Sequence, residues 1–333
     1  MSLLLPRTLR HTLRHTRPLR LRPLQASPYS TTPPPPPRRS KNLALAAAAA
    51  TLTTLAAGTY TYTTTRTPTS TLNPHTFTPY TLTTKTPISA GPTPTSIFTL
   101  TPTSPSPPLP FTTGILSLQI KQPQLQIARP YTPLPPPPEK DDGTIRLLIK
   151  REPGGEMSRY LYSLPEGAAV ELRGPQVDYV YTPSDLSGER KIVFFAGGTG
   201  IAPALQVASS LLGGEGGKGK GRAEILWAVR RREETGGAMA DEVARLAGRV
   251  DPEGVGRLVV RVFVDGEGGI GVRDVEAAVG GGARVFVSGP EGFIGWIAGP
   301  KGFRDGREEQ GPVGGMVGSV LRRKGGNVEV FKL

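Results

Sequence analysis

Two regions of the chain differ in how apolar and polar residues alternate. From about residue 75 to residue 175, six short segments alternate apolar with polar residues or are rich in β-branched residues, which predicts strands with one buried face. Six short strands and one helix indicate a small antiparallel barrel. The strands are TFTPYTLTTKT, TSIFTLTP, GILSLQIK, QLQIARPYT, TIRLLIKR and AAVELRGP, with the helical segment MSRYLYSL before the last.

The second region begins after residue 191, where predicted strands alternate with predicted helices. Strands that alternate with helices predict an open, mostly parallel sheet, whose ligands bind beyond the carboxyl ends of its strands. We therefore expect a barrel domain over 75–185 and an α/β domain over 186–333. The expected strands are IVFFA, AEILWAV, RLVVRVFV, ARVFVS and VEVFKL, with helical stretches near 203–212, 238–247, 272–279 and 313–323.

Residues 1–41 have the composition of a targeting segment. Arg7, Arg10, Arg14 and Arg17 recur at steps of 3, 4 and 3, which places them on one face of a helix. An Arg-rich, acid-free amphipathic start is typical of a mitochondrial presequence. A disordered basic tail is the alternative.

Residues 42–65 contain no charge and, as a helix, are long enough to cross the hydrocarbon core of a bilayer. We expect a single transmembrane helix here, and the alternative is an alanine-rich linker. The basic residues at 38–41 favour an N-terminus in the matrix. The folded part would then face the intermembrane space from the mitochondrial inner membrane, on a tether at 66–74.

The net charge of +13 belongs to the N-terminal part of the chain. Of the 40 Lys and Arg, 13 precede Glu139, whereas no Asp or Glu does, so the remaining chain is neutral. A basic face for nucleic acid is therefore not expected. The absence of Cys and the presence of only three His argue against a metal centre and against a Cys or His catalytic group.

A predicted buried strand runs into a glycine turn at FFAGGTGIAPAL. Glycines let a diphosphate lie against backbone N–H groups, and the N-terminus of the following helix adds partial positive charge. The candidate nucleotide contacts are Gly197, Gly198, Thr199, Gly200 and Pro203. The other interpretation is a tight strand–helix turn in a chain that has 42 glycines.

A second strand, VFVSGPEGF, also ends in a glycine turn. Because the carboxyl ends of parallel strands meet at one edge of a sheet, we expect Ser288, Gly289 and Pro290 to lie beside the first turn.

Two further motifs lie in the barrel. In ARPYTPLPP, Arg129 offers a fixed positive fork for a diphosphate. Tyr131 offers a flat ring and Thr132 a hydroxyl, and prolines such as Pro130 hold the stretch extended. In GGEMSRYL, the residues Gly155, Met157 and Ser158 begin a helix whose N-terminus offers a second phosphate contact. Taken singly, each motif also fits an ordinary strand, turn or helix cap.

In this order the four motifs resemble the ferredoxin–NADP reductase superfamily, and most closely its cytochrome b5 reductase-like branch. The family patterns Arg-x-Tyr-Ser/Thr, Gly-x-x-Ser/Thr, Gly-Gly-Thr-Gly-x-x-Pro and Cys-Gly-Pro-x-Gly-Phe match residues 129–132, 155–158, 197–203 and 288–293. Ser288 stands in place of the family cysteine. The resemblance covers about 75–333, and it implies FAD in the barrel and NAD(P)H on the sheet domain.

The resemblance also implies roles for single residues. Arg129 and Ser158 would meet the FAD diphosphate, Tyr131 would lie along the flavin, and Thr132 would hydrogen-bond near its N5. Lys150 matches a position near both cofactors.

The implied reaction is hydride transfer from NAD(P)H to FAD, followed by single electrons to a haem acceptor, with no side-chain acid or base. Thr132 and Ser288 would lie nearest the reacting atoms. Phe331 is a candidate cover for the flavin, or equally a core residue of an edge strand.

The sequence leaves the nicotinamide type open. The segment WAVRRREET follows the second sheet strand, where the 2′-position of the adenine ribose is sensed. Arg230, Arg231 and Arg232 favour a 2′-phosphate, whereas Glu233 and Glu234 favour NADH.

Within the superfamily, the expected presequence, the membrane anchor, the proline-rich insertions and the FKL terminus resemble a fungal inner-membrane branch implicated in haem attachment to apocytochrome c. That resemblance implies haem, cytochrome c haem lyase and apocytochrome c as partners. The alternatives are an NADH–cytochrome b5 reductase and a non-catalytic flavin-bound scaffold.

Overall fold

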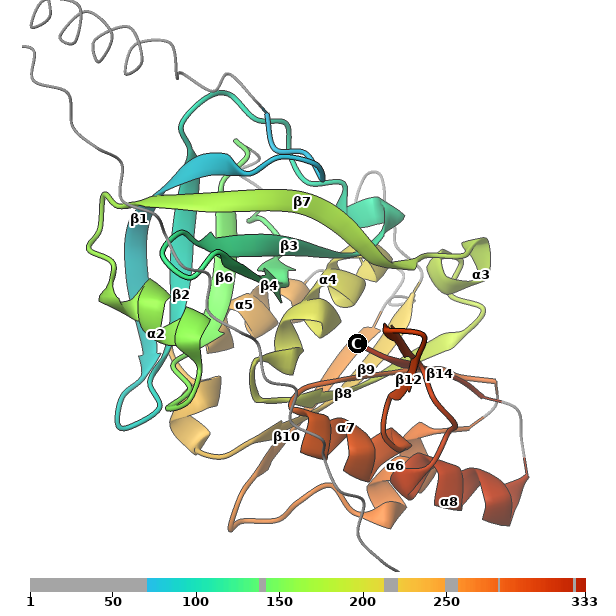
Figure 1. Ribbon diagram of the computed structural model, residues 1–333. Coiled ribbons are helices and arrows are strands. Elements are labelled where there is room, and N and C mark those ends of the chain that lie inside the picture. Colours follow the sequence, from blue (N-terminus) through green and yellow to red (C-terminus); the bar gives the residue numbers. More distant parts are fainter. Residues whose placement is uncertain (1–70, 138–141, 213–220, 249–256, 281, 326–327) are drawn as a thin grey trace, which may run out of the picture. The chain divides into compact units, whose positions relative to one another are not determined.

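The computed structural model describes residues 71–137, 142–212, 221–248, 257–280, 282–325 and 328–333. They belong to one compact unit that runs from Thr67 to Leu333 (Figure 1). The predicted presequence, the predicted membrane helix and most of the tether lie outside the described residues. Among the helices that are described, none is long and apolar enough to cross a membrane.

The first part of the described chain is an antiparallel sheet of seven strands in the order β4-β3-β7-β1-β2-β6-β5. Its two outermost strands, β4 and β5, are separated along the chain by Thr132 alone, so the edges of the sheet are held together and it curls into a barrel. The bounds are β1 (Thr78–Ser89), β2 (Thr95–Pro102), β3 (Gly114–Gln122), β4 (Ile127–Tyr131), β5 (Pro133–Leu134), β6 (Ile145–Lys150) and β7 (Ala169–Val180), with η1 (Phe111–Thr113) before β3.

Alternation of apolar and polar residues builds the barrel core. In β1, Tyr80 and Leu82 are buried and Thr81 between them is not, as expected when successive side chains point to opposite faces of a sheet. Helix α2 (Glu156–Ser163) adds Met157 and Leu161 to the same core. The sequence predicts six strands, and the seventh, β5, is two residues of the proline-rich stretch that follows the fourth predicted strand.

The second part is a sheet of five strands, all parallel, in the order β10-β9-β8-β11-β14. The strand order reverses between β8 and β11, and a crevice for ligands forms at the carboxyl ends where such a reversal occurs. The fold class predicted from the sequence, an antiparallel barrel followed by a parallel α/β sheet, is confirmed. The strands are β8 (Lys191–Gly197), β9 (Arg222–Val229), β10 (Arg257–Val264), β11 (Arg284–Ser288) and β14 (Glu329–Lys332).

Helices cover both faces of this sheet. In β8, Phe194 packs with α4 and α5 and with barrel residues, whereas Val193 and Phe195 pack with α6, α7 and α8 on the other face. Figure 1 shows α4 between the barrel and the sheet. The helices are α4 (Ile201–Leu212), α5 (Ala238–Ala247), α6 (Val272–Ala278), α7 (Glu291–Ala298) and α8 (Gly315–Lys324).

Besides β5, two α-helices and one hairpin are not predicted from the sequence. They are α3 (Pro183–Leu186) in the connection between the two parts, helix α7, and a hairpin of β12 (Gly302–Arg304) and β13 (Arg307–Glu309). Phe331 could cover the flavin or pack in the core of an edge strand, and the structure shows it in the core. Its ring packs on Phe286 and Tyr179, with centroids 5.5 and 4.7 Å away.

Candidate functional site

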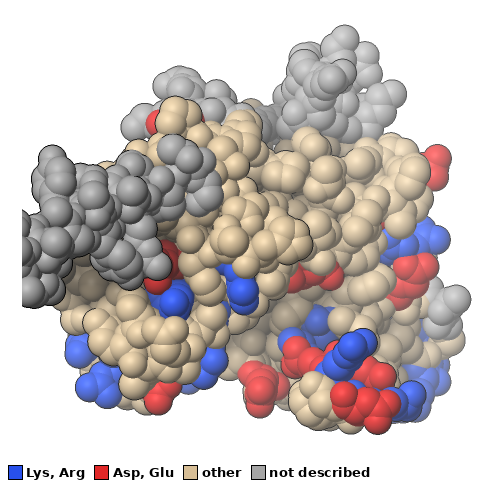
Figure 2. Space-filling model, turned by 45° about the horizontal axis from the view of Figure 1, so that its top comes forward, with Lys and Arg blue, Asp and Glu red and all other residues tan. Residues whose placement is uncertain are grey.

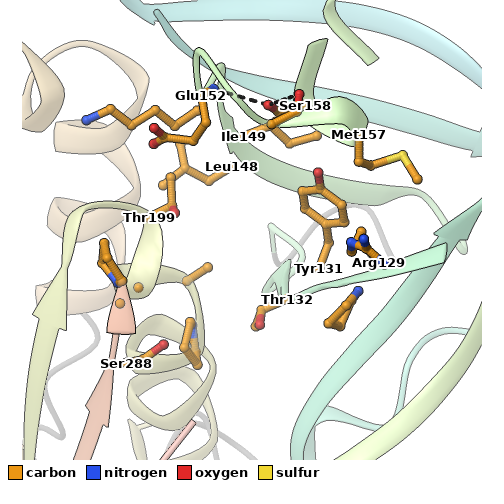
Figure 3. A pocket seen from close by; sticks show the side chains of 18 of the residues that line it. Arg129, Tyr131, Thr132, Leu148, Ile149, Glu152, Met157, Ser158, Thr199 and Ser288 are labelled. Carbon is orange, nitrogen blue, oxygen red and sulfur yellow. Dashed lines mark hydrogen bonds between the residues drawn. The ribbon is translucent and has the colours of Figure 1, made fainter. Parts of the chain in front are cut away.

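A cavity of about 700 Å³ opens between the barrel and the carboxyl ends of β8 and β11 (Figure 3). Its size is within the usual range for ligand and cofactor sites. Of the residues predicted from the sequence, the lining includes Arg129, Pro130, Tyr131, Thr132, Lys150, Gly155, Met157, Ser158, Thr199, Gly200, Pro203, Ser288, Gly289 and Pro290. Gly197 and Gly198 are not among the lining residues.

The glycines of the turn after β8 serve different purposes. A Cβ on Gly197 would lie 2.8 Å from the Phe293 ring, and one on Gly200 would lie 2.3 Å from the Ser288 carbonyl oxygen. Gly198 has a φ of +56° and open space around it, so it is needed for backbone conformation. Two of the three glycines therefore let the turn after β8 pack closely against Ser288 and Phe293. The diphosphate contact expected from the sequence stays a prediction.

Packing of the two turns places hydroxyl groups on the sheet side of the cavity. The turn η2 (Gly198–Gly200) is held by the Trp227 indole, whose Nε1 donates to the Gly198 carbonyl at 2.9 Å. Thr199 and Ser288 line the cavity from this side, and both are labelled in Figure 3. Among the described residues, neither hydroxyl has a hydrogen-bond partner.

The barrel side of the cavity carries the β4 motif. Arg129 is exposed, and in the described part of the chain its guanidinium bonds only to the neighbouring Ala128 carbonyl, at 3.1 Å. Burial raises the pKa of Tyr131 to about 12, although the charge of Arg129 lowers it, so the phenol is neutral at physiological pH. The Thr132 hydroxyl has no protein partner among the described residues.

The loop before α2 is shaped by Ser158. Its hydroxyl accepts from the Glu152 backbone N–H at 3.1 Å and donates to the Gly155 carbonyl at 3.2 Å. A Cβ on residue 155 would lie 2.6 Å from the Ser158 Oγ, which explains the glycine there. Ser158 thus holds the loop closed, and no side chain caps α2, so the first backbone N–H groups of the helix are free for an anion.

Lys150 lines the cavity, but its charge is already paired. Its Nζ donates to both carboxylate oxygens of Glu234, at 3.1 and 3.0 Å, and the two side chains are 9% and 4% exposed. Glu234 lies in η4 (Arg232–Thr235) of the α/β domain. Sequence alone does not indicate this pair, because the partners are 84 residues apart and meet only when the two domains dock.

The three arginines after β9 separate in the structure. Arg231 donates to the Thr93 carbonyl at 3.3 Å, and Arg232 pairs with Glu267. Arg230 lines the cavity, and within the described residues its guanidinium has no hydrogen-bond or ion-pair partner.

Some lining residues were not found from the sequence. Leu148, Ile149 and Glu152 lie outside the quoted motifs, whereas Gly154, Glu156 and Ala202 lie within them at positions to which the sequence assigns no role. Glu152 and Glu156 add two exposed carboxylates beside the predicted anion contacts. The others are Leu148, Ile149, Gly154 and Ala202.

Charged side chains of the described residues also lie outside this cavity. On the face seen in Figure 2, Lys and Arg lie among Asp and Glu, and no continuous basic field appears on its described part. No group of three or more potential metal ligands occurs among the described residues.

The barrel matches a known protein family. Residues 79–181 match the family described as oxidoreductase FAD-binding domain. An NADH-cytochrome b5 reductase 1 of Ajellomyces capsulatus is 29% identical over 205 residues, which are 56% of this chain and 64% of that protein. A cytochrome c mitochondrial import factor of Saccharomyces cerevisiae is 32% identical over 132 residues, which are 27% of this chain and 36% of that protein. The chain thus covers between about a third and two thirds of these relatives.

Solved structures share the whole two-part fold. The cytochrome b5 reductase domain of Ulva prolifera nitrate reductase has a TM-score of 0.58 at 20% identity, over 79% of this chain and 99% of that chain. A flavohemoglobin of Malassezia yamatoensis with bound FAD and haem has a TM-score of 0.55 at 18% identity, over 78% of this chain and 61% of that one.

Proposed function

We propose that this chain, which belongs to the cytochrome b5 reductase-like FAD-dependent NAD(P)H oxidoreductases, takes a hydride from a nicotinamide dinucleotide and delivers single electrons to a haem acceptor. The observation that carries the proposal is the convergence in one cavity of polar groups that the described residues leave available: three hydroxyls and the Arg230 guanidinium have no protein partner there, and the Arg129 guanidinium bonds only the adjacent Ala128 carbonyl. Arg129 and Thr132 come from the barrel, and Thr199, Ser288 and Arg230 from the sheet domain.

The residues present fit FAD on the barrel side. Arg129 has no carboxylate partner among the described residues, and the uncapped start of α2 presents backbone N–H groups, so two separate positive ends face one cavity. Neutral Tyr131 adds a flat apolar face beside them. Bound FAD supplies the exchange between two-electron and one-electron chemistry that side chains lack.

The chain's own residues would contribute position and environment. Thr132 on one side and Ser288 on the other present hydroxyls across the cavity, where they can orient the reacting rings. The Lys150–Glu234 pair holds the cavity wall with no net charge. No side chain needs to gain or lose a proton in the hydride step.

A spectrum of the purified full chain tests this function. We expect a yellow protein that releases FAD on denaturation and is bleached anaerobically by NAD(P)H. A folded, colourless chain that cannot be reconstituted with FAD would contradict the proposal. A yellow chain that no nicotinamide reduces would instead support the scaffold alternative.

For the nicotinamide, we propose a preference for NADPH. Glu234 is committed to Lys150, and two of the three arginines have other partners. That leaves the Arg230 guanidinium as the charge of this segment that faces the cavity, and a free arginine after the second strand suits a 2′-phosphate. Arg230→Ala should raise the KM for NADPH about tenfold and leave that for NADH unchanged, and an equal change in both would argue against this role.

For the acceptor, we propose haem destined for apocytochrome c, in the mitochondrial inner membrane. This rests on the expected presequence and on the membrane helix expected at 42–65, and it is supported by the similarity to the Saccharomyces cerevisiae import factor. The similarity to NADH-cytochrome b5 reductase 1 favours cytochrome b5 as the second candidate. Reduction of ferric haem by the full chain and NADPH, measured beside reduction of cytochrome b5, separates the two.

Protease protection tests the proposed location. In mitoplasts with a ruptured outer membrane, added protease should digest the folded part, since it would face the intermembrane space. Protection there, or release of the chain by alkaline carbonate, would contradict the orientation or the anchor.

A further inference from the structure

Gln206 of helix α4 is a fully buried polar side chain that contacts the barrel. It is 0% exposed. Its Oε1 accepts from the Leu116 backbone N–H at 2.8 Å, and its Nε2 donates to the Leu116 carbonyl at 3.0 Å and to the Pro133 carbonyl at 2.7 Å. Both N–H donors of this amide and one bond of its oxygen therefore end on the backbone of the other domain.

The barrel needs this contact because of where β4 ends. The pairing of β3 with β4 runs from Gln122 back to Leu118, opposite Tyr131, and the chain then leaves into β5. Leu116 lies two residues beyond that pairing, and both of its backbone groups on this side meet Gln206. The glutamine amide thus takes the place of one residue of a neighbouring strand, since a buried backbone group without a partner is unfavourable.

The same contact spans the two halves of the cavity. On the sheet side, Pro203 lines the cavity one helical turn before Gln206 in α4. On the barrel side, the acceptor Pro133 directly follows Thr132, which also lines the cavity. One turn further along α4, Ser210 donates to the Phe111 carbonyl at 2.8 Å, so the helix is held to the barrel at successive turns.

We infer that Gln206 is a positioning residue for hydride transfer, which fixes the distance between the nicotinamide side and the flavin side of the cavity. The inference rests on the proposed function. Hydride transfer depends steeply on the separation and alignment of donor and acceptor, and a small displacement can cost up to ~100-fold in rate. A rigid tie that lies one helical turn from Pro203 and ends one residue from Thr132 controls that separation without touching either cofactor.

The test uses Gln206→Leu and Gln206→Glu in the full chain, with flavin reduction by NADPH followed anaerobically in a stopped-flow instrument. At saturating nucleotide we expect Gln206→Leu to reduce the rate about tenfold or more, with little change in the dissociation constants of NADPH and FAD. A fully expressed deuterium isotope effect from 4-deuterated nucleotide would show that the hydride step itself has slowed.

Gln206→Glu keeps the shape but faces two carbonyl oxygens with a carboxylate. Protonation of that carboxyl restores one donor, so its reduction rate should rise toward the wild-type rate as the pH is lowered, whereas the wild-type rate should not rise in this way. This variant also serves if Gln206→Leu does not fold.

Gln310, an exposed glutamine, provides a control with the same bonding pattern. Its side chain also bonds both backbone groups of one residue, Lys332, at 2.6 and 3.1 Å, but at the β14 edge, within the α/β domain. Gln310→Leu should leave the reduction rate unchanged. Hydrogen exchange of the Leu116 amide in the flavin-free chain supplies a measurement that does not depend on activity, and it should accelerate in Gln206→Leu only.

The outcomes distinguish failure of the positioning role from failure of the proposed function. If wild-type flavin is not reduced by any nicotinamide, the proposed function fails. If it is reduced, and folded, FAD-loaded Gln206→Leu keeps the wild-type rate, the positioning role is wrong and the function stands. An equal loss of rate in Gln310→Leu would also overturn the inference, because a general loss of stability would then explain both.

Discussion

The two ends of the parallel sheet both carry arginines, but they use them differently. At the amino end, Arg284 begins β11 and is 4% exposed. It donates to both oxygens of Asp185, at 2.5 and 2.6 Å, and it also bonds Glu329. At the carboxyl end, Arg230 faces the cavity and has no partner among the described residues.

The paired Arg284 stabilises the fold, whereas Arg230, unpaired among the described residues, is available to a ligand. Asp185 lies in α3, in the connection between the two domains, so its pair with Arg284 fixes the connection to the sheet. The buried charge of Arg284 is already neutralised by two carboxylates, so it is not available to a ligand. A charge that the fold leaves unpaired beside a cavity is available to one.

The largest expected effect comes from breaking the ion pair of Arg284 and Asp185 at the amino end of the sheet. Arg284→Met leaves the Asp185 carboxylate buried without a cation, which should cost about 3–5 kcal/mol in the free energy of unfolding. Chemical denaturation of the full chain measures this. Arg304→Met is the control, because Arg304 is 75% exposed and lies 3.8 Å from Glu309, and an exposed pair of this kind contributes about 1 kcal/mol at most. A similar small loss in both variants would contradict the structural role of Arg284.

The next effect should appear at the cavity rather than in folding. Arg129→Ala removes a charge-assisted contact to the FAD diphosphate, which should weaken FAD binding by about 2 kcal/mol, or about 30-fold. Fluorescence titration of the flavin-free chain measures it. Arg159→Ala, on the exposed side of α2 and outside the cavity lining, should have no effect. Unchanged FAD binding in Arg129→Ala would remove Arg129 from the site.

A smaller effect is expected at Ser288. The side chain lines the cavity, and its hydroxyl has no hydrogen bond among the described residues, so Ser288→Cys should be accommodated without unfolding. The resemblance places cysteine here, and the larger, more polarisable sulfur should hold the nicotinamide closer to its productive position. We expect anaerobic flavin reduction to accelerate by about tenfold or less, which is about 1.4 kcal/mol in the barrier.

The control for this exchange is Ser187→Cys, an exposed serine in the domain connection. The nucleotide dissociation constant should change little in either variant. An unchanged or slower rate in Ser288→Cys would mean that serine is already the better residue for this reaction, or that the position is not near the hydride path.

Sequence periodicity predicted the elements that carry a regular apolar pattern. The strands β8, β9 and β11 and the helix α4 bury one or both faces continuously, so their pattern is strong. β5 has only two residues, one of them a proline, which argues against a strand. Helix α7 contains two interior glycines, and the β12–β13 hairpin is largely exposed, so neither carries a clear pattern.

The site was predictable as a set of positions and less so as a set of roles. Fourteen of the predicted residues line one cavity, because they lie in or near the ends of elements that meet where the domains dock. The Gly197 and Gly200 contacts depend on Phe293 and Ser288 from another strand end. The partner of Lys150 and the barrel contacts of Gln206 depend on docking of the domains, which local sequence does not encode.

The smallest expected effect concerns Tyr131 at high pH. Burial raises the pKa of this phenol to about 12 in the folded chain, against about 10 in an unfolded chain. A raised pKa means that folding favours the protonated form. Its contribution to stability is therefore complete below pH 10 and is lost as the pH rises through 12.

Tyr131→Phe cannot ionise, so it should lose less stability than the wild type as the pH rises. Between pH 8 and pH 11 the wild type should lose at most about 1.4 kcal/mol more of its free energy of unfolding than Tyr131→Phe does. Denaturant titrations of the flavin-free chains at both pH values measure it. Burial also raises the pKa values of Tyr179 and Tyr181, so both chains lose stability at high pH and only their difference reports on Tyr131. Parallel losses would mean that Tyr131 is solvated in the flavin-free protein, and would weaken its assignment as the apolar face of the flavin site.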